Sequence, residues 1–186
     1  MLKRALIWGG AIAAVVVATA GLMIFATAGA TVFRVEGNRL YMSGPMTGAS
    51  PERFEMLVEQ HPGLTTVVFG DMADVADITA LIQNGYRIRG LGLVTEVTPG
   101  ARIEGDAVWL ILGGVERQIG DRAEIVLRDW GGAALDREAA AHEERRRYVA
   151  DMLGDDAFYW RSLDGAASGH VMTGLEIEDF GLATDG

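Results

Sequence analysis

The feature that most constrains this chain is a long run without a charged side chain, from Ala5 to Phe33. An α-helix rises about 1.5 Å per residue, so about 20 residues of this run suffice to span the roughly 30 Å hydrocarbon core of a bilayer. Lys3 and Arg4 precede the run, and Arg34 follows it. Since basic residues stay on the cytoplasmic side of membrane segments, we expect one pass with the N-terminus in the cytoplasm.

A cleaved signal peptide is the competing interpretation, because Ala28-Gly29-Ala30 resembles a small-residue cleavage site. The run is longer than the hydrophobic region of about 7–15 residues that signal peptides carry, and this length favours a retained signal-anchor. A buried soluble helix fits poorly, because polar residues at helical spacing are missing. We therefore expect residues 1–34 to form a membrane anchor and residues 35–186 an extracytoplasmic domain. In a bacterium, this places the anchor in the inner membrane and the domain in the periplasm.

The charge of the domain excludes several partners. The whole chain has a net charge of -10, and its first 33 residues contain Lys3, Arg4 and no acid. The remainder is therefore more acidic than the whole chain. It would repel nucleic-acid phosphates, so we expect no nucleic-acid partner. No cysteine is present, which excludes disulfides, thiolate metal sites and a cysteine nucleophile.

We also expect no metal ion and no cofactor. His142 is followed directly by Glu143 and Glu144, but adjacent residues do not share a helix face. Asp71, Asp74 and Asp77 come at a spacing of three and lack the spacing and terminal Glu of a calcium-binding EF-hand loop.

The pattern of apolar residues predicts an α/β domain. Candidate strands cover residues 39–44, 65–69, 91–97 and 123–127. Candidate helices cover residues 51–60 with Ser50 as N-cap, 75–84 and 135–153. The apolar run 107–112 fits either a strand or a buried helix. Because strands alternate with helices, we expect a layered domain with parallel strand pairs.

Read in order, the domain resembles the Clp-protease/crotonase superfamily, in particular its small predicted periplasmic Clp-like members. Residues 88–97 read I-R-G-L-G-L-V-T-E-V and look like the family strand I-R-x-x-G-L-x-T-x-V. The resemblance covers roughly Tyr41 to Thr184. It implies a Clp/crotonase-like fold, preceded here by one transmembrane helix. The other matching segments are Tyr41–Gly48, Phe54–Leu57 with Pro62, Thr66–Phe69, Gly114–Arg117 and Glu176–Thr184.

The resemblance also implies that the catalytic positions of the family peptidases are lost. Gly105 stands where the family has its serine nucleophile, and Arg128 stands where it has its histidine. An arginine stays protonated and cannot act as a general base. The glycine-rich oxyanion loop is replaced by Gly70–Asp74, where the carboxylates of Asp71 and Asp74 would oppose a developing oxyanion. We therefore expect an inactive relative of the peptidases.

The other serines and histidines are expected to be structural or solvated. His142 falls on a polar helix face, and Ser168 and His170 fall in a tail loop without an evident buried acid. The triplet Arg145–Arg147 is expected to be a solvated face paired with nearby acids. We expect Trp109 to fill the core. Trp130 and the aromatics of residues 158–160 are expected in the core as well, with an anchor for a protein interface as the alternative.

The function that these observations favour is a membrane-anchored, non-catalytic scaffold or accessory subunit of an envelope complex. The partner would be another protein or a second copy of the chain. The surface where substrate would enter in the family is the candidate binding region, with Asp71, Asp74, Glu104, Asp106, Arg128 and Trp130 around it. Two alternatives stay open: a serine-type envelope peptidase or hydrolase with an unrecognised site, and a module that binds acyl-thioesters or peptides.

Overall fold

The computed structural model describes residues 29–73, 75–165 and 168–184. Residues 1–28, which are most of the predicted anchor of residues 1–34, lie outside these ranges. Within them, no helix is both long and apolar enough to cross a membrane. The first strand, β1, covers Val32–Glu36, so it begins before the boundary expected after Arg34.

A five-stranded mixed sheet forms one half of the domain, with the strand order β1-β2-β3-β4-β6. β1 pairs antiparallel with β2 (Arg39–Ser43), and the remaining neighbours are parallel: β3 (Thr66–Phe69), β4 (Val94–Val97) and β6 (Arg117–Ile119). All four residues of β3 are buried, which explains why its sequence shows no alternation between apolar and polar residues.

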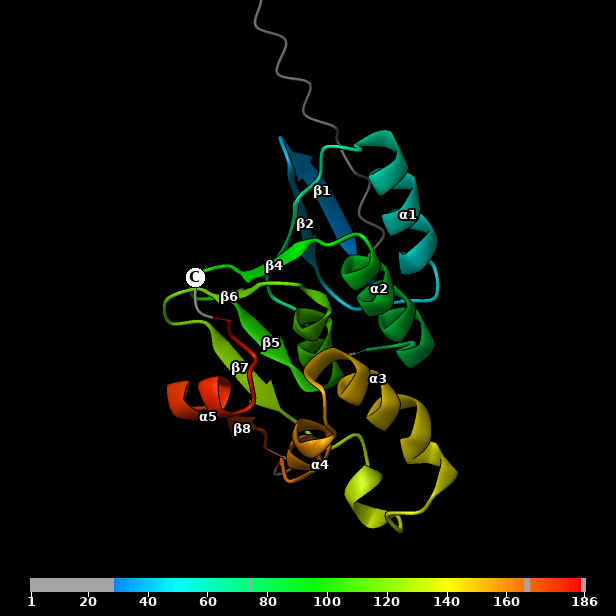
Figure 1. Ribbon diagram of the computed structural model, residues 1–186, viewed down its shortest axis with the longest axis vertical. Helices are drawn as coiled ribbons and strands as arrows, with labels where there is room; N and C mark the ends of the chain where they lie inside the picture. The colour runs from blue at the N-terminus through cyan, green and yellow to red at the C-terminus, as the bar shows by residue number, and fades with distance from the viewer. Residues whose placement is uncertain (1–28, 74, 166–167, 185–186) are drawn as a thin grey trace, which may run out of the picture.

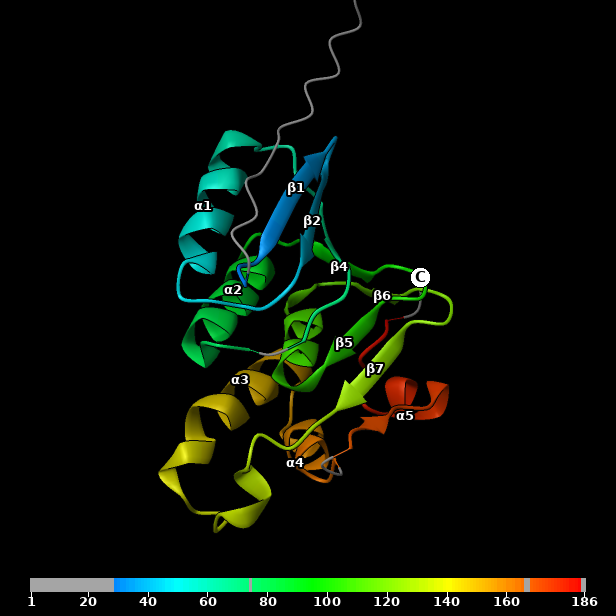
Figure 2. The same cartoon turned by 180° about the vertical axis from the view of Figure 1, so that it is seen from behind.

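A second, smaller sheet has the order β5-β7-β8. β5 (Arg102–Glu104) runs parallel to β7 (Glu124–Leu127), and β7 pairs antiparallel with β8 (His170–Val171). Figure 1 and Figure 2 show β5 and β7 side by side below the first sheet. The expectation of an α/β domain with parallel strand pairs is therefore confirmed.

The apolar run after β5 is a helix and not a strand. Gly105–Gly113 form the 3₁₀ helix η1, whose residues from Ala107 onward are buried. Trp109 is almost fully buried there, as predicted. A helix that is apolar on every side needs cover all round. That cover comes from β4, β5 and β7 and from the helices α2 (Ile78–Gly90) and α3 (Glu143–Leu153), all of which contact η1.

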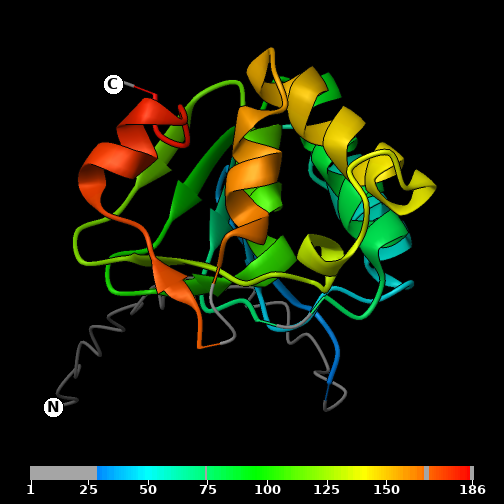
Figure 3. The same ribbon diagram turned by 90° about the horizontal axis from the view of Figure 1, so that it is seen from below.

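The α-helices of the described residues pack around the sheets. Figure 1 shows α1 and α2 together beside the first sheet, and α3, α4 and α5 in the lower half of the molecule, away from β1. Figure 3 shows these three helices from below. Two short 3₁₀ turns, η2 (Gly132–Ala134) and η3 (Ala140–His142), precede α3. The helices are α1 (Ser50–Gln60), α2 (Ile78–Gly90), α3 (Glu143–Leu153), α4 (Ala157–Leu163) and α5 (Gly174–Asp179).

Two expectations about helix starts were wrong. Ser50 is the first residue of α1 and not its cap, because Ala49 takes the N-cap position. The Ser50 hydroxyl instead accepts a hydrogen bond from the Thr47 amide at 3.0 Å and shares one with the Thr31 hydroxyl at 2.6 Å. α2 begins at Ile78, because the Asp77 carboxylate accepts from the Ala80 amide and caps the helix there.

Two expectations about helix extent were also wrong. α2 does not stop near Asn84 but passes through Gly85 to Gly90. The helix expected over residues 135–153 begins only at Glu143, because Leu135 and Ala139 have extended backbones. In this segment the Arg137 guanidinium lies 4.5 Å above the centre of the Trp160 ring. Tertiary contacts of this kind override the helical tendency of the sequence.

Candidate functional site

A cavity of about 450 Å³ opens at the carboxyl ends of β5 and β7. Because these strands are parallel neighbours, the residues that follow them meet at one edge of the sheet. The structure thereby brings together four of the predicted binding residues with Gly105. The lining residues are Ala73, Val75, Glu104, Gly105, Asp106, Arg128, Asp129 and Trp130.

Gly105 stands at the turn from β5 into η1, and its φ of +59° is a conformation that side-chain-bearing residues rarely adopt. A Cβ placed there would lie 3.9 Å from the Cβ of Arg128. The position therefore has room for a small side chain but a backbone that suits glycine. The places that the resemblance assigns to the family's nucleophile and base adjoin each other, and neither residue can perform that role.

Asp71 lies beside a neighbouring cavity of about 630 Å³, and not in the first. Its carboxylate accepts a hydrogen bond from the Arg102 amide at 2.9 Å, which fixes it against β5. The two cavities share Ala73 and Glu104 in their linings. Asp74, the remaining predicted residue, lies outside the described residues.

Glu104 is held by two arginines. Arg128 donates to it at 2.7 Å, and Arg102 donates both to it and to Glu124. The hydrogen bond from Arg102 is the main cause that lowers the pKa of Glu104. These four residues form a network with equal numbers of positive and negative charges, so Arg128 serves this network and is not a free cation.

Asp106 differs from Glu104, because it accepts no hydrogen bond within the described ranges. Its side chain is only 13% exposed, and its nearest cation is Arg145, whose Nε lies 3.9 Å from Oδ2. Burial raises the pKa of Asp106 to about 6, Arg145 opposes this rise, and the charge of Asp129 adds to it. The cavity therefore contains a carboxyl group that exchanges its proton close to neutral pH.

An aromatic cluster supports the Trp130 wall of the cavity. The guanidinium carbon of Arg145 lies 4.1 Å from the centre of the Trp130 ring. The His142 ring packs edge-on to Trp130 and shares a hydrogen bond of 2.5 Å with the Tyr159 hydroxyl. His142 is 2% exposed, so its expected place on a polar face was wrong. The expectation that Arg145 belongs to a solvated face was also wrong.

Sequence reasoning missed two residues at this site, Asp129 and Arg145. Asp129 lies between Arg128 and Trp130, both of which were predicted, so its position in the chain was an available signal. Arg145 reaches the site from α3, and no local pattern indicates that this part of α3 packs against the loop after β7.

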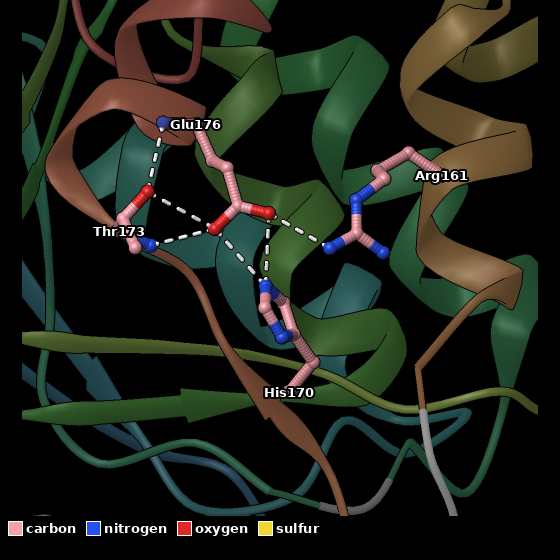
Figure 4. A network of polar contacts seen from close by, with 4 residues as sticks. All are labelled: Arg161, His170, Thr173 and Glu176. Carbon is pink, nitrogen blue, oxygen red and sulfur yellow. Dashed lines mark hydrogen bonds and ion pairs between the residues drawn. The ribbon is translucent and has the colours of Figure 1, made fainter.

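The serines and histidines have other partners. The Ser162 hydroxyl donates to the Tyr159 carbonyl at 2.7 Å, and His170 is paired with Glu176 (Figure 4). No hydrogen bond joins a serine to a histidine in residues 29–73, 75–165 and 168–184. In the same ranges, no three His, Asp or Glu side chains gather as a metal site would require.

The sequence matches no protein-family model and no curated protein. Solved structures do match it. An enoyl-CoA hydratase/isomerase from Marinobacter aquaeolei has a TM-score of 0.55 at 11% identity, over 82% of this chain and 68% of that chain. A membrane-bound stomatin-specific protease has a TM-score of 0.54 at 12% identity, over 77% of this chain and 75% of that chain. The chain has the Clp/crotonase fold.

A third match extends the crotonase side of this likeness. An enoyl-CoA hydratase from Mycobacterium avium subsp. paratuberculosis has a TM-score of 0.53 at 14% identity, over 87% of this chain and 72% of that chain. Identities this low show a shared fold and leave activity to be argued from the site.

Proposed function

We propose that this protein is a membrane-anchored, catalytically inactive member of the Clp/crotonase fold that serves as a scaffold or accessory subunit of an envelope complex. One observation carries the proposal: among the described residues, the cavity at the ends of β5 and β7 is lined by Gly105 and Arg128 and by neither serine nor histidine. A serine hydrolase needs a hydroxyl nucleophile beside a group that accepts its proton. The cavity lining lacks this pair, but it keeps a shaped, charged surface that suits a partner.

The membrane part of the proposal is supported by the uncharged run of residues 5–33 and by Lys3 and Arg4 before it. One of the similar structures is described as a membrane-bound protease. We accordingly propose a bacterial inner-membrane protein with a single pass, a cytoplasmic N-terminus and a periplasmic domain. The partner is a protein of the same membrane.

A pull-down of the tagged full-length chain from gently solubilised membranes, followed by mass spectrometry, tests this function. We expect a membrane protein at a stoichiometric ratio to the bait. Glu104→Ala should weaken the capture, because it breaks the network with Arg102 and Arg128 at the cavity. The matched control is Glu59→Ala, at an exposed position of α1, which should leave capture unchanged. Recovery of the bait alone, or only with itself, would contradict the accessory-subunit role.

A second candidate function is acid–base catalysis, and the environment of Asp106 favours it. A carboxyl group with a pKa of about 6 in a cavity can give or take a proton at neutral pH. The enoyl-CoA hydratases of the same fold suggest an enoyl-thioester as the substrate to try. The acidic lining opposes this ligand, because coenzyme A carries phosphates.

Incubation with a short-chain enoyl-CoA, followed by its absorbance, decides this candidate. Turnover that Asp106→Asn abolishes would favour catalysis over the scaffold. A thermal-shift screen with acyl-thioesters and peptides tests binding without turnover. Flat responses to every acyl-thioester would count against both thioester alternatives.

A further inference from the structure

The two cavities beside β5 adjoin each other, and together they are called the groove below. The cavity at Trp130 and the cavity at Asp71 share Ala73 and Glu104, and their linings together follow β5 from Arg102 to Glu104 and continue to Asp106 at the start of η1. Their volumes are about 450 and 630 Å³. A groove that follows a strand in this way suits an extended chain segment better than a compact ligand.

One end of this groove lies next to the last residues of the predicted anchor, residues 1–34. Gly44 and Pro45 line the cavity at Asp71. The Thr31 hydroxyl donates to the Pro45 carbonyl at 2.6 Å, and the Ala30 carbonyl lies 3.2 Å from the place of a Cβ on Gly44. A segment that leaves the membrane beside the anchor would therefore meet this end of the groove first.

The other end of the groove is negatively charged. Arg102, Glu104, Glu124 and Arg128 bind one another and balance in charge. Asp106 and Asp129 are the other two charged residues of the lining, and Arg145 is the cation nearest to Asp106. The Asp106 side chain is largely buried, lines the cavity and accepts no hydrogen bond among the described residues. Such a carboxylate gains most from a cationic donor.

Trp130 forms a wall of the cavity beside these two carboxylates. Its ring already binds one guanidinium, that of Arg145. The alkyl stem of a lysine or arginine can pack against such a wall while its charged head reaches the carboxylates.

We propose that this groove binds an extended segment of a membrane-protein partner and that one lysine or arginine of the segment enters the cavity between Asp106, Asp129 and Trp130. The inference rests on the proposed function, since that function makes the groove the surface that binds the partner. It adds which part of the partner binds there, an extended segment with a lysine or arginine. The end of the groove beside Gly44 and Pro45 lies near the predicted anchor, which is why the segment is taken to come from a membrane protein. The negative charge at the other end is why the inserted side chain is taken to be basic.

Site-specific photo-crosslinking of the full-length chain in its native membranes tests this inference. The crosslinker replaces Ala73, which is exposed and lines both cavities. Mass spectrometry of the adduct should identify one segment of another membrane protein with a lysine or arginine within a few residues of the attachment point. Asp106→Asn combined with Asp129→Asn should lower the adduct yield about tenfold, and added salt should lower the wild-type yield.

The matched control is Asp121→Asn combined with Asp136→Asn, which removes the same charge at exposed positions and should leave the yield unchanged. A crosslinker at Glu59 on α1 reports on another face. Any of three results would overturn the inference. These are an adduct segment without a basic residue, an unchanged adduct yield in the Asp106 and Asp129 variant, and an adduct formed from Glu59 alone. If the pull-down still recovered a partner, the proposed function would stand. A bait recovered alone without any adduct would overturn both.

Discussion

A Cβ on residue 85 would overlap the hydroxyl of Tyr148 and lie 2.6 Å from its ring carbon Cζ, so α2 and α3 can approach each other here only because residue 85 is a glycine. η1 joins the same contact, because a Cβ on Gly113 would lie 2.7 Å from the Gly85 carbonyl oxygen. The Tyr148 hydroxyl donates to the Trp109 carbonyl in η1 at 2.9 Å. Three helices are thus packed at one point in the core.

Gly85→Ala should therefore destabilise the domain, although alanine is the better helix former. Overpacking a tight core typically costs about 1–3 kcal/mol, and we expect the upper part of this range because the Tyr148 ring is fully buried. Urea unfolding of the two proteins measures the change. The matched control is Gly90→Ala at the end of α2, where a Cβ meets nothing within 4 Å. Equal stability of wild type and Gly85→Ala would show that the helices are not so closely packed.

Tyr148→Phe should also destabilise the domain, by about 1–3 kcal/mol, because it leaves the Trp109 carbonyl without this donor in a dry core. The loss of the hydroxyl also removes one atom that a Cβ at position 85 would meet. Gly85→Ala should therefore cost less free energy in the Tyr148→Phe background than in the wild type. A double-mutant cycle by urea unfolding measures this coupling, and strict additivity would contradict it.

The helix through Gly85 illustrates what the sequence could not predict. Glycine followed by polar residues is a common stop signal, and only the tertiary contact with Tyr148 shows that this glycine serves packing. His142 was misread for a related reason. Its neighbours Glu143 and Glu144 suggest a solvated face, whereas its partner Tyr159 comes from another helix. Strands such as Thr66–Phe69 were predictable because burial on both faces leaves a continuous apolar run.

The candidate site was predictable to the extent that it depends on parallel strands. Glu104 and Arg128 end or follow neighbouring strands, so the fold alone brings them together. Asp71 was expected at the same place, but its bond to the Arg102 amide holds it in the adjoining cavity. The position of the Arg145 side chain depends on how α3 packs against the rest of the domain, and the local sequence does not determine this packing.

The domain should lose stability in acid as the Glu176 carboxylate becomes protonated. Its carboxylate accepts from the Thr173 amide, from Arg161 and from His170 (Figure 4), and these bonds, the Thr173 amide first, lower its pKa to about 2. A carboxyl group with a lowered folded-state pKa stabilises the fold above its unfolded pKa of about 4.5 and loses this effect as the pH falls toward 2.

Glu176→Gln should accordingly be less stable than the wild type at neutral pH, and the difference should shrink as the pH falls from about 4.5 to 2. Thermal unfolding across this range measures the difference. Glu178→Gln, which changes an exposed acid of the same helix, is the control. A gap that stays constant with pH would contradict the assigned role of the carboxylate.

Asp106 should have the opposite effect on how stability depends on pH. Burial raises its folded-state pKa from 3.8 to about 6, so the folded state binds the proton more tightly than the unfolded state. Stability should therefore fall as the pH rises from about 4 to 6, and Asp106→Asn should remove this part of the slope. Unfolding in urea over this pH range measures the slope, with Asp136→Asn as an exposed control. An identical slope in wild type and Asp106→Asn would contradict the burial argument.

Restoring the family's residue types at the two altered positions should not restore a serine hydrolase. Gly105→Ser places a hydroxyl in the cavity but forces a side-chain-bearing residue to a φ of +59°, which costs about 1–2 kcal/mol. Arg128→His supplies a base but removes a donor of Glu104. The Glu104 carboxylate stays bonded to Arg102, so it is not free to orient the new imidazole as the acid of a triad does. We therefore expect the double variant to fold less stably and to resist a fluorophosphonate probe, as the wild type should. Labelling of the hydroxyl that Gly105→Ser introduces would show that the cavity retains a working oxyanion site, whereas labelling of any native serine in the wild type would revive the peptidase alternative.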